Sequence, residues 1–317
     1  MTLRLTVQRD AWSAAVRSTA SSLGDMVPVI KGNGYGFGAH VLMSHAILFA
    51  DTIAVGTIYE SRTVPSSHAP MVLTPVGNDV GSLTVHPRAI LTVGSPDHLT
   101  TLQRLGYNGR IVIKLRSSMN RYGIDPDECN AIRGTAETSG IEIAGWSLHP
   151  PLAENGRDHA AEVSTWLSRL DATLPLYVSH VGAASLTALR SQHPQHRIVV
   201  RSGTELWLGD KAHMRLSTEV VDVRRGVTGT AGYRPNAVPS GATIVMVGAG
   251  SSHGIAALTD GASPFHFGKQ RMSLLEAPHM HTSMLIVNAE SPCPQYGDSI
   301  DVQQPMTRVF PDVIDWV

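Results

Sequence analysis

The stretch Ile30-Lys31-Gly32-Asn33-Gly34-Tyr35-Gly36-Phe37-Gly38 follows the apolar residues 26–29 and decides how the chain is interpreted. A lysine at the end of a buried strand loses its proton readily, because burial disfavours the ammonium form. The neutral amine is the form that makes a Schiff base with a carbonyl. Glycines let the backbone approach a bulky ligand, and a tyrosine hydroxyl can hydrogen-bond a phosphate. These residues indicate a covalently held pyridoxal phosphate (PLP). The alternative is a turn after a strand, with an exposed lysine.

The same stretch resembles the Lys-Ala-Asn-Ala-Tyr-Gly-His-Gly signature of the alanine racemases. The resemblance implies a fold-type III PLP protein. It also implies that Lys31 forms the Schiff base with the cofactor and that Tyr35 contacts the cofactor's phosphate.

Composition argues against several other classes of protein. The chain has 317 residues, 42% hydrophobic and 16% charged, which is enough for two soluble domains. Its net charge of -1 gives no reason to expect a nucleic acid or a membrane as a partner. Cys129 and Cys293 lie far apart and form no metal pattern, which favours a reducing compartment. Residues 1–10 read as a strand and not as a signal peptide, so we expect a cytoplasmic protein.

The chain changes character after about residue 207. Before it, short apolar runs alternate with helical segments, which predicts an α/β domain with a parallel sheet. About eight such units fit a TIM-type (β/α)8 barrel, whose active site gathers at the carboxyl ends of the strands. The expected strands are 27–30, 53–55, 71–74, 89–93, 111–115, 143–147, 177–181 and 198–201. Beyond it, short strands separated by Gly, Pro and Asn predict an all-β domain. We therefore expect a PLP-binding barrel over residues 1–210 and a β-rich domain over 211–317, the order found in alanine racemases.

Two further segments resemble the family. Lys114-Leu-Arg-Ser-Ser-Met-Asn-Arg121-Tyr-Gly resembles Lys-x-x-x-x-Met-x-Arg-x-Gly. There the arginine contacts the substrate carboxylate and the cofactor's phenolic oxygen, and the lysine, often carbamylated, holds that arginine. Arg121 and Lys114 inherit these roles. Val200-Arg201-Ser-Gly-Thr-Glu-Leu-Trp-Leu-Gly resembles Val-Arg-x-Gly-Ile-x-x-Tyr-Gly. The resemblance implies that Arg201 hydrogen-bonds the pyridine nitrogen and that Gly203 and Thr204 offer backbone N–H groups to the phosphate. On residue type alone, surface arginines remain the alternative.

Two other positions match the family more loosely. His149 follows a strand and, by resemblance, packs against the pyridine ring, although Pro150-Pro151 departs from the family pattern. A structural histidine is the alternative. Ser185 opens an expected helix near the family's phosphate segment and could meet the phosphate there.

The β-rich domain departs from the family where the chemistry needs it most. Val247-Gly-Ala-Gly-Ser251-Ser-His253-Gly aligns with Val-Pro-Ile-Gly-Tyr-Ala-Asp-Gly, whose tyrosine is the second catalytic base and reaches into the partner subunit. Ser251 is a poorer acid/base than a phenol, so His253 is a candidate replacement. Pro278-His-Met280-His281-Thr resembles the family's Ile-Cys-Met-Asp segment, which contacts the substrate, and the resemblance implies that Met280 does so too. His281 replaces the family's aspartate and is a competing base. His279 and His281 would share one face of a strand, as a metal pair or as surface histidines; we expect no metal.

We therefore expect a PLP-dependent amino-acid racemase or epimerase acting as a head-to-tail homodimer. Lys31 would exchange the Cα proton on one face, and a histidine or serine of the β-rich domain on the other. A fold-type III PLP decarboxylase or lyase, or a PLP-binding protein without turnover, is the alternative. The side chain of the amino-acid substrate stays open.

Overall fold

The computed structural model describes residues 2–82, 84–152, 159–288 and 291–317. The chain forms two compact units. One comprises Val16–Gly32 and Ala39–Trp207. The other comprises Met1–Ala15, Asn33–Gly38 and Leu208–Val317.

The first unit is a barrel of eight parallel strands. Around the sheet they are ordered β2 (Met26–Pro28), β9 (Ile198–Ser202), β8 (Leu176–Val178), β7 (Glu142–Ser147), β6 (Arg110–Lys114), β5 (Ile90–Val93), β4 (Ala69–Pro75) and β3 (Thr52–Val55). A parallel bridge between Val29 and Ala54 closes the sheet. The predicted TIM-type barrel is confirmed.

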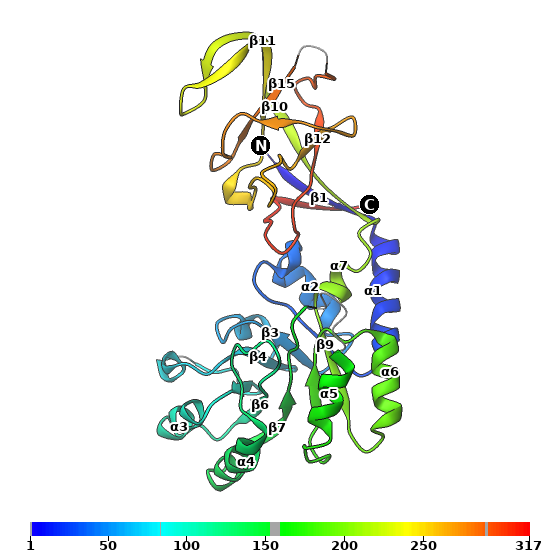
Figure 1. Ribbon diagram of the computed structural model, residues 1–317, viewed down its shortest axis with the longest axis vertical. Coiled ribbons are helices and arrows are strands. Elements are labelled where there is room, and N and C mark those ends of the chain that lie inside the picture. Colours follow the sequence, from blue (N-terminus) through cyan, green and yellow to red (C-terminus); the bar gives the residue numbers. More distant parts are fainter. Residues whose placement is uncertain (1, 83, 153–158, 289–290) are drawn as a thin grey trace. The chain divides into compact units, whose positions relative to one another are not determined.

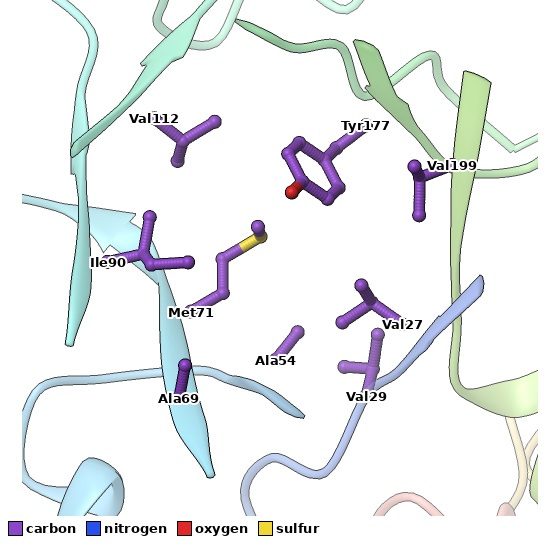
Figure 2. Close-up of a cluster of buried hydrophobic side chains, with 9 residues drawn as sticks. All are labelled: Val27, Val29, Ala54, Ala69, Met71, Ile90, Val112, Tyr177 and Val199. Atoms are coloured by element: carbon purple, nitrogen blue, oxygen red, sulfur yellow. The ribbon is translucent and has the colours of Figure 1, made fainter. Parts of the chain in front are cut away.

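Small and branched apolar side chains fill the barrel interior. Figure 2 shows nine of them, drawn from seven strands and the residue after β2, pointing toward a common centre. Met71 lies in the middle of this cluster and is fully buried, and Tyr177 closes one side. Strands of this kind are apolar on both faces because helices cover the outside of a parallel barrel. The interior is a packed core, so a ligand site has to lie at an end of the barrel.

Helices cover only part of the barrel. They are α2 (Ala39–Ala46), α3 (Pro96–Arg104), α4 (Cys129–Thr138), α5 (His159–Leu167), α6 (Ala183–Gln192) and the short α7 (Thr204–Leu208) (Figure 1). After β3 and after β4, the described residues form 3-10 turns in place of an α-helix, at Glu60–Thr63 and Asn78–Ser82. A turn at Pro126–Glu128 precedes α4. The helix α1 (Arg9–Leu23) follows the first strand of the chain.

The second unit is mainly β-strand, together with short turns and the first part of α1. Its sheet contains β1 (Leu3–Val7), β10 (Met214–Ala231), β11 (Asn236–Val247), β12 (Phe265–Phe267), β13 (Gln270–Arg271), β14 (Ser273–Leu274), β15 (Ser283–Val287), β16 (Ser299–Val302) and β17 (Val313–Trp316). The strand expected near the N-terminus exists, and Leu3, Leu5 and Val7 are fully buried. It pairs with β10 and β17, so the first residues of the chain belong to this sheet.

Several expected elements differ from those observed. The short strands that the pattern predicts at 220–223 and 243–247 are parts of one long hairpin, β10 and β11. The register of this hairpin shifts at bulges. Alternation breaks at a bulge, and the pattern then reads as separate strands. The strand expected at 177–181 ends at Val178. His279 and His281 were expected on a strand and instead lie in the bend before β15.

Candidate active site

Lys31 stands where the barrel closes. The backbone N–H groups of Val29 and Ile30 donate to Ser202 on one side and Ala54 on the other, at 2.8 Å each. Lys31 therefore leaves the sheet at the carboxyl end of the strands. Part of its side chain is exposed, but desolvation, followed by the positive charges of Arg121 and Arg201, lowers its pKa. The neutral amine therefore forms more readily here than at a fully hydrated lysine.

Glu60 fixes the backbone around Lys31. Its carboxylate accepts hydrogen bonds from the N–H groups of Gly32 at 2.9 Å, Gly56 at 2.6 Å and Thr57 at 3.2 Å. A Cβ on Gly56 would lie 2.8 Å from Glu60 Oε2 and 3.1 Å from Lys31 Cβ, so this approach suits glycine. The negative charge of Glu60 opposes the lowering of the Lys31 pKa. Sequence reasoning missed Glu60, because its partners lie up to 28 residues away.

A closed loop brings Arg121 back toward Lys114. The backbone N–H of Arg116 donates to the Ile124 carbonyl, and the N–H of Ile124 donates to the Lys114 carbonyl, both at 2.9 Å. A Cβ on Gly123 would lie 2.5 Å from the carbonyl carbon and oxygen of Leu115, which explains a glycine at this place in the motif. Lys114 is 5% exposed. Burial, then Arg201 and Arg121, lower its pKa well below the ordinary value.

Arg201 is buried at the end of β9 with one donor unused. Its Nη2 donates to the Leu148 carbonyl at 2.7 Å, while Nε has no partner among the described residues. Burial lowers its pKa to about 10, so the guanidinium stays positive at neutral pH. A buried cationic N–H without an acceptor is costly and uncommon, and it indicates a place for a ligand atom that can accept a hydrogen bond.

His149 is held neutral beside these cations. Its Nδ1 shares a hydrogen bond with Ser179 Oγ, and its ring centroid lies 4.6 Å from that of His180. Burial, then the charges of Arg201 and Lys114, lower its pKa to about 2. A neutral imidazole in this position adds no further positive charge to the site.

The other predicted cofactor contacts of the barrel occupy strand ends and helix starts. Gly203 and Thr204 follow β9 at the beginning of α7. The indole Nε1 of Trp207, on the same helix, donates a hydrogen bond to the Val29 carbonyl at 2.8 Å. Ser185 is half-buried and is the third residue of α6, because the helix begins at Ala183 and not at the serine.

Tyr35 belongs to the second unit by its packing. It lies in the turn Gly34–Gly36 with φ 55° and is 4% exposed. Asn33 Nδ2 donates to the carbonyls of Met306 and Val309, at 2.8 and 2.6 Å. The glycine-rich stretch therefore folds against the end of the chain, a contact that its sequence did not indicate.

The predicted residues of the β-rich domain form a second group. Ser251 and His281 are exposed, Met280 is 68% exposed, and His253 is 7% exposed. The rings of His253 and His281 have their centroids 6.0 Å apart. Ser252 and Asp312, which sequence reasoning did not single out, contact these histidines. Within the described residues, no group of three or more His, Cys, Asp or Glu could hold a metal ion, and no helix could span a membrane.

Comparison with known proteins agrees with this architecture. The family model for the alanine racemase N-terminal domain matches residues 7–210, and the chain therefore belongs to the alanine racemase family. No curated protein matches the chain significantly.

Solved structures with the same fold are remote in sequence. The alanine racemase from Acinetobacter baumannii aligns over 100% of both chains with TM-score 0.70 and 14% identity. The biosynthetic enzyme from Pseudomonas aeruginosa aligns over 100% of this chain and 99% of its own, with TM-score 0.74 and 20% identity. The enzyme from Bartonella henselae, which has covalently bound pyridoxal phosphate, aligns over 96% and 91%, with TM-score 0.74 and 17% identity.

Proposed function

We propose that this protein is a PLP-dependent amino-acid racemase or epimerase. The observation that carries the proposal is the Nε of buried Arg201, which has no partner among the described residues and lies at the same end of the barrel as a lysine of lowered pKa. A pyridine nitrogen is an acceptor that this N–H can serve. The residues present therefore fit PLP, with Lys31 as the amine that holds it.

Each side chain of the barrel site has a role that its environment supports. PLP, when bound, withdraws electrons from Cα and so makes the Cα proton of an amino acid acidic. Arg201 would donate to the pyridine nitrogen. Arg121 would bind the substrate carboxylate, because a guanidinium can grip a carboxylate through two hydrogen bonds. Lys114 would position Arg121, and Lys31 Nζ would exchange the Cα proton on one face.

The phosphate contacts are proposed at three places. Gly203 and Thr204 would donate hydrogen bonds to the phosphate from their backbone N–H groups at the start of α7. Ser185, on α6, would donate from its hydroxyl, and Tyr35 would donate from its phenolic O–H. His149, held neutral, would pack against the pyridine ring.

We also propose a head-to-tail homodimer. Ser251, Met280 and His281 are exposed on the β-rich unit. In the dimer, these residues of one subunit would complete the active site at the end of the other subunit's barrel. Mixing a Lys31→Ala subunit with a His281→Asn subunit would restore one site per heterodimer. A fully active monomer in sedimentation would contradict this arrangement.

The test of function uses the protein saturated with PLP and a panel of single-enantiomer amino acids in deuterated water. A racemase incorporates deuterium at Cα and loses chirality. A decarboxylase or lyase releases CO2 or another fragment. Such release is worth measuring because, by resemblance, Ser251 is expected to take the place of the family's catalytic tyrosine. A carrier does neither.

A further inference from the structure

Two loops of the β-rich unit are joined by backbone hydrogen bonds. Ser251 N–H donates to the His279 carbonyl at 2.7 Å, and Ser252 N–H donates to the Met280 carbonyl at 2.9 Å. A Cβ on Gly250 would lie 2.2 Å from the His279 oxygen, so only glycine permits this approach. The turn Ser251–His253 and the bend at residues 279–281 therefore form one connected surface.

His253 has both ring nitrogens engaged inside this surface. Its Nδ1 accepts from the Gly250 N–H at 3.0 Å, and an acceptor nitrogen carries no hydrogen. The hydrogen of the neutral ring is then on Nε2, which lies 3.1 Å from Asp312 Oδ2. The ring is 7% exposed, and the His253 carbonyl accepts from Phe310 N–H at 3.0 Å. His253 thus has no lone pair left to offer a substrate.

His281 has the opposite tautomer, and its Nε2 has no hydrogen-bond partner in the part of the chain that the structure describes. The Ser252 hydroxyl donates its one hydrogen to the Met280 carbonyl, with Oγ 2.5 Å from that oxygen. His281 Nδ1 lies 3.0 Å from the same Oγ and must therefore donate to it. This leaves the lone pair on Nε2 of an exposed side chain. Ser252 fixes both the orientation and the tautomer of the imidazole.

We propose that His281, positioned by Ser252, is the acid/base group on the substrate face opposite Lys31, and that His253 is structural. The proposal rests on the proposed racemase function. For one enantiomer, His281 Nε2 would take the Cα proton, and the electron pair of the broken C–H bond would stay on the substrate, where bound PLP would stabilise it. Lys31 Nζ would return a proton to the other face. For the other enantiomer the two groups exchange roles, so no oxidant or reductant is needed.

The first measurement is a nitrogen NMR spectrum of the histidine-labelled holoenzyme at neutral pH. We expect His281 as the Nδ1–H tautomer and His253 as the Nε2–H tautomer, assigned with His281→Asn and His253→Gln. Ser252→Ala removes the acceptor of His281 Nδ1 and should shift the His281 tautomer, which a merely structural serine would not do. A His281 ring protonated on Nε2 in the wild-type protein would overturn the proposal.

The second measurement is Cα deuterium exchange from L- and D-alanine, used as probe substrates. In His281→Asn, exchange from one enantiomer should fall by at least ~10²-fold, the usual contribution of a general base. Exchange from the other enantiomer, through Lys31, should continue. His266→Asn, on β12 of the same unit, is the matched control and should retain both. If the wild type exchanges both enantiomers and His281→Asn does so equally well, this proposal fails while the racemase function stands. If the wild type exchanges neither enantiomer of alanine or of any other amino acid in the panel used to test the function, both fail.

Discussion

Arg201 donates from Nη2 to the carbonyl oxygen of Leu148 at 2.7 Å and leaves its Nε buried without a partner. One hydrogen bond thus holds the guanidinium, and Nε keeps its hydrogen without an acceptor among the described residues. This relationship between β9 and the end of β7 is the feature of the barrel that best matches a pyridine cofactor.

Replacing Arg201 by glutamate tests that match. A buried carboxylate near the pyridine nitrogen would favour its protonated form, since opposite charges stabilise each other there. The absorption spectrum of the PLP-loaded protein, with and without an amino acid, should change, and racemisation should slow by ~10²-fold or more, comparable with the loss of an aligned electrostatic contact. Arg169→Glu, at an exposed position of the same unit, is the control and should keep the wild-type spectrum. An unchanged spectrum in folded Arg201→Glu would count against the assignment.

Lys114 is expected to carry a carbamate. Its lowered pKa makes the neutral amine, the form that reacts with CO2, more accessible, and Arg201 and Arg121 would stabilise the resulting anion. Carbon NMR of protein kept in isotopically labelled bicarbonate should show one carbamate signal that Lys114→Gln removes and Lys269→Gln keeps. Absence of the signal in the wild type would show that the amine itself holds Arg121.

His149 should make the protein sensitive to acid. Its folded pKa of about 2 lies below the ordinary 6.5, so between these values the unfolded state binds more protons. The contribution of His149 is fully present above pH 6.5 and is lost as pH falls, with a slope of up to about 1.4 kcal/mol per pH unit. Denaturant unfolding between pH 7 and pH 4 should show a shallower loss of stability in His149→Asn. Parallel curves for the two proteins would contradict the assignment.

The sequence was enough to predict those features that depend on local pattern. The buried strands before Lys31 and Arg201 are runs of branched apolar residues, and these runs predicted both the barrel and the end of it that carries the charged groups. Features that depend on distant partners could not be predicted. Glu60, Ser252 and Asp312 look like ordinary surface residues until folding brings Gly32, His281 and His253 to them. The long hairpin of β10 and β11 was predicted as separate short strands, because bulges interrupt its alternation of apolar and polar residues.

Gly250 should be irreplaceable for a steric reason. In Gly250→Ala the new Cβ would meet the His279 oxygen at 2.2 Å, and the two loops would have to separate. We expect a loss of stability of about 1–3 kcal/mol, as for other overpacked sites, together with lost racemisation. Gly134→Ala is the matched control, because a Cβ there meets nothing within 4 Å and alanine favours the helix. Equal stability of the two variants in thermal unfolding would show that the loops can move apart freely.

The central claim is that Lys31 holds the cofactor, and reductive trapping tests it most directly. The chain has four lysines, Lys31, Lys114, Lys211 and Lys269. After incubation with PLP, borohydride reduction and peptide mapping, we predict a stable adduct on Lys31 alone, and in Lys31→Ala neither adduct nor visible absorbance. An adduct on another lysine at full occupancy in the wild-type protein, or one that persists in Lys31→Ala, would contradict it.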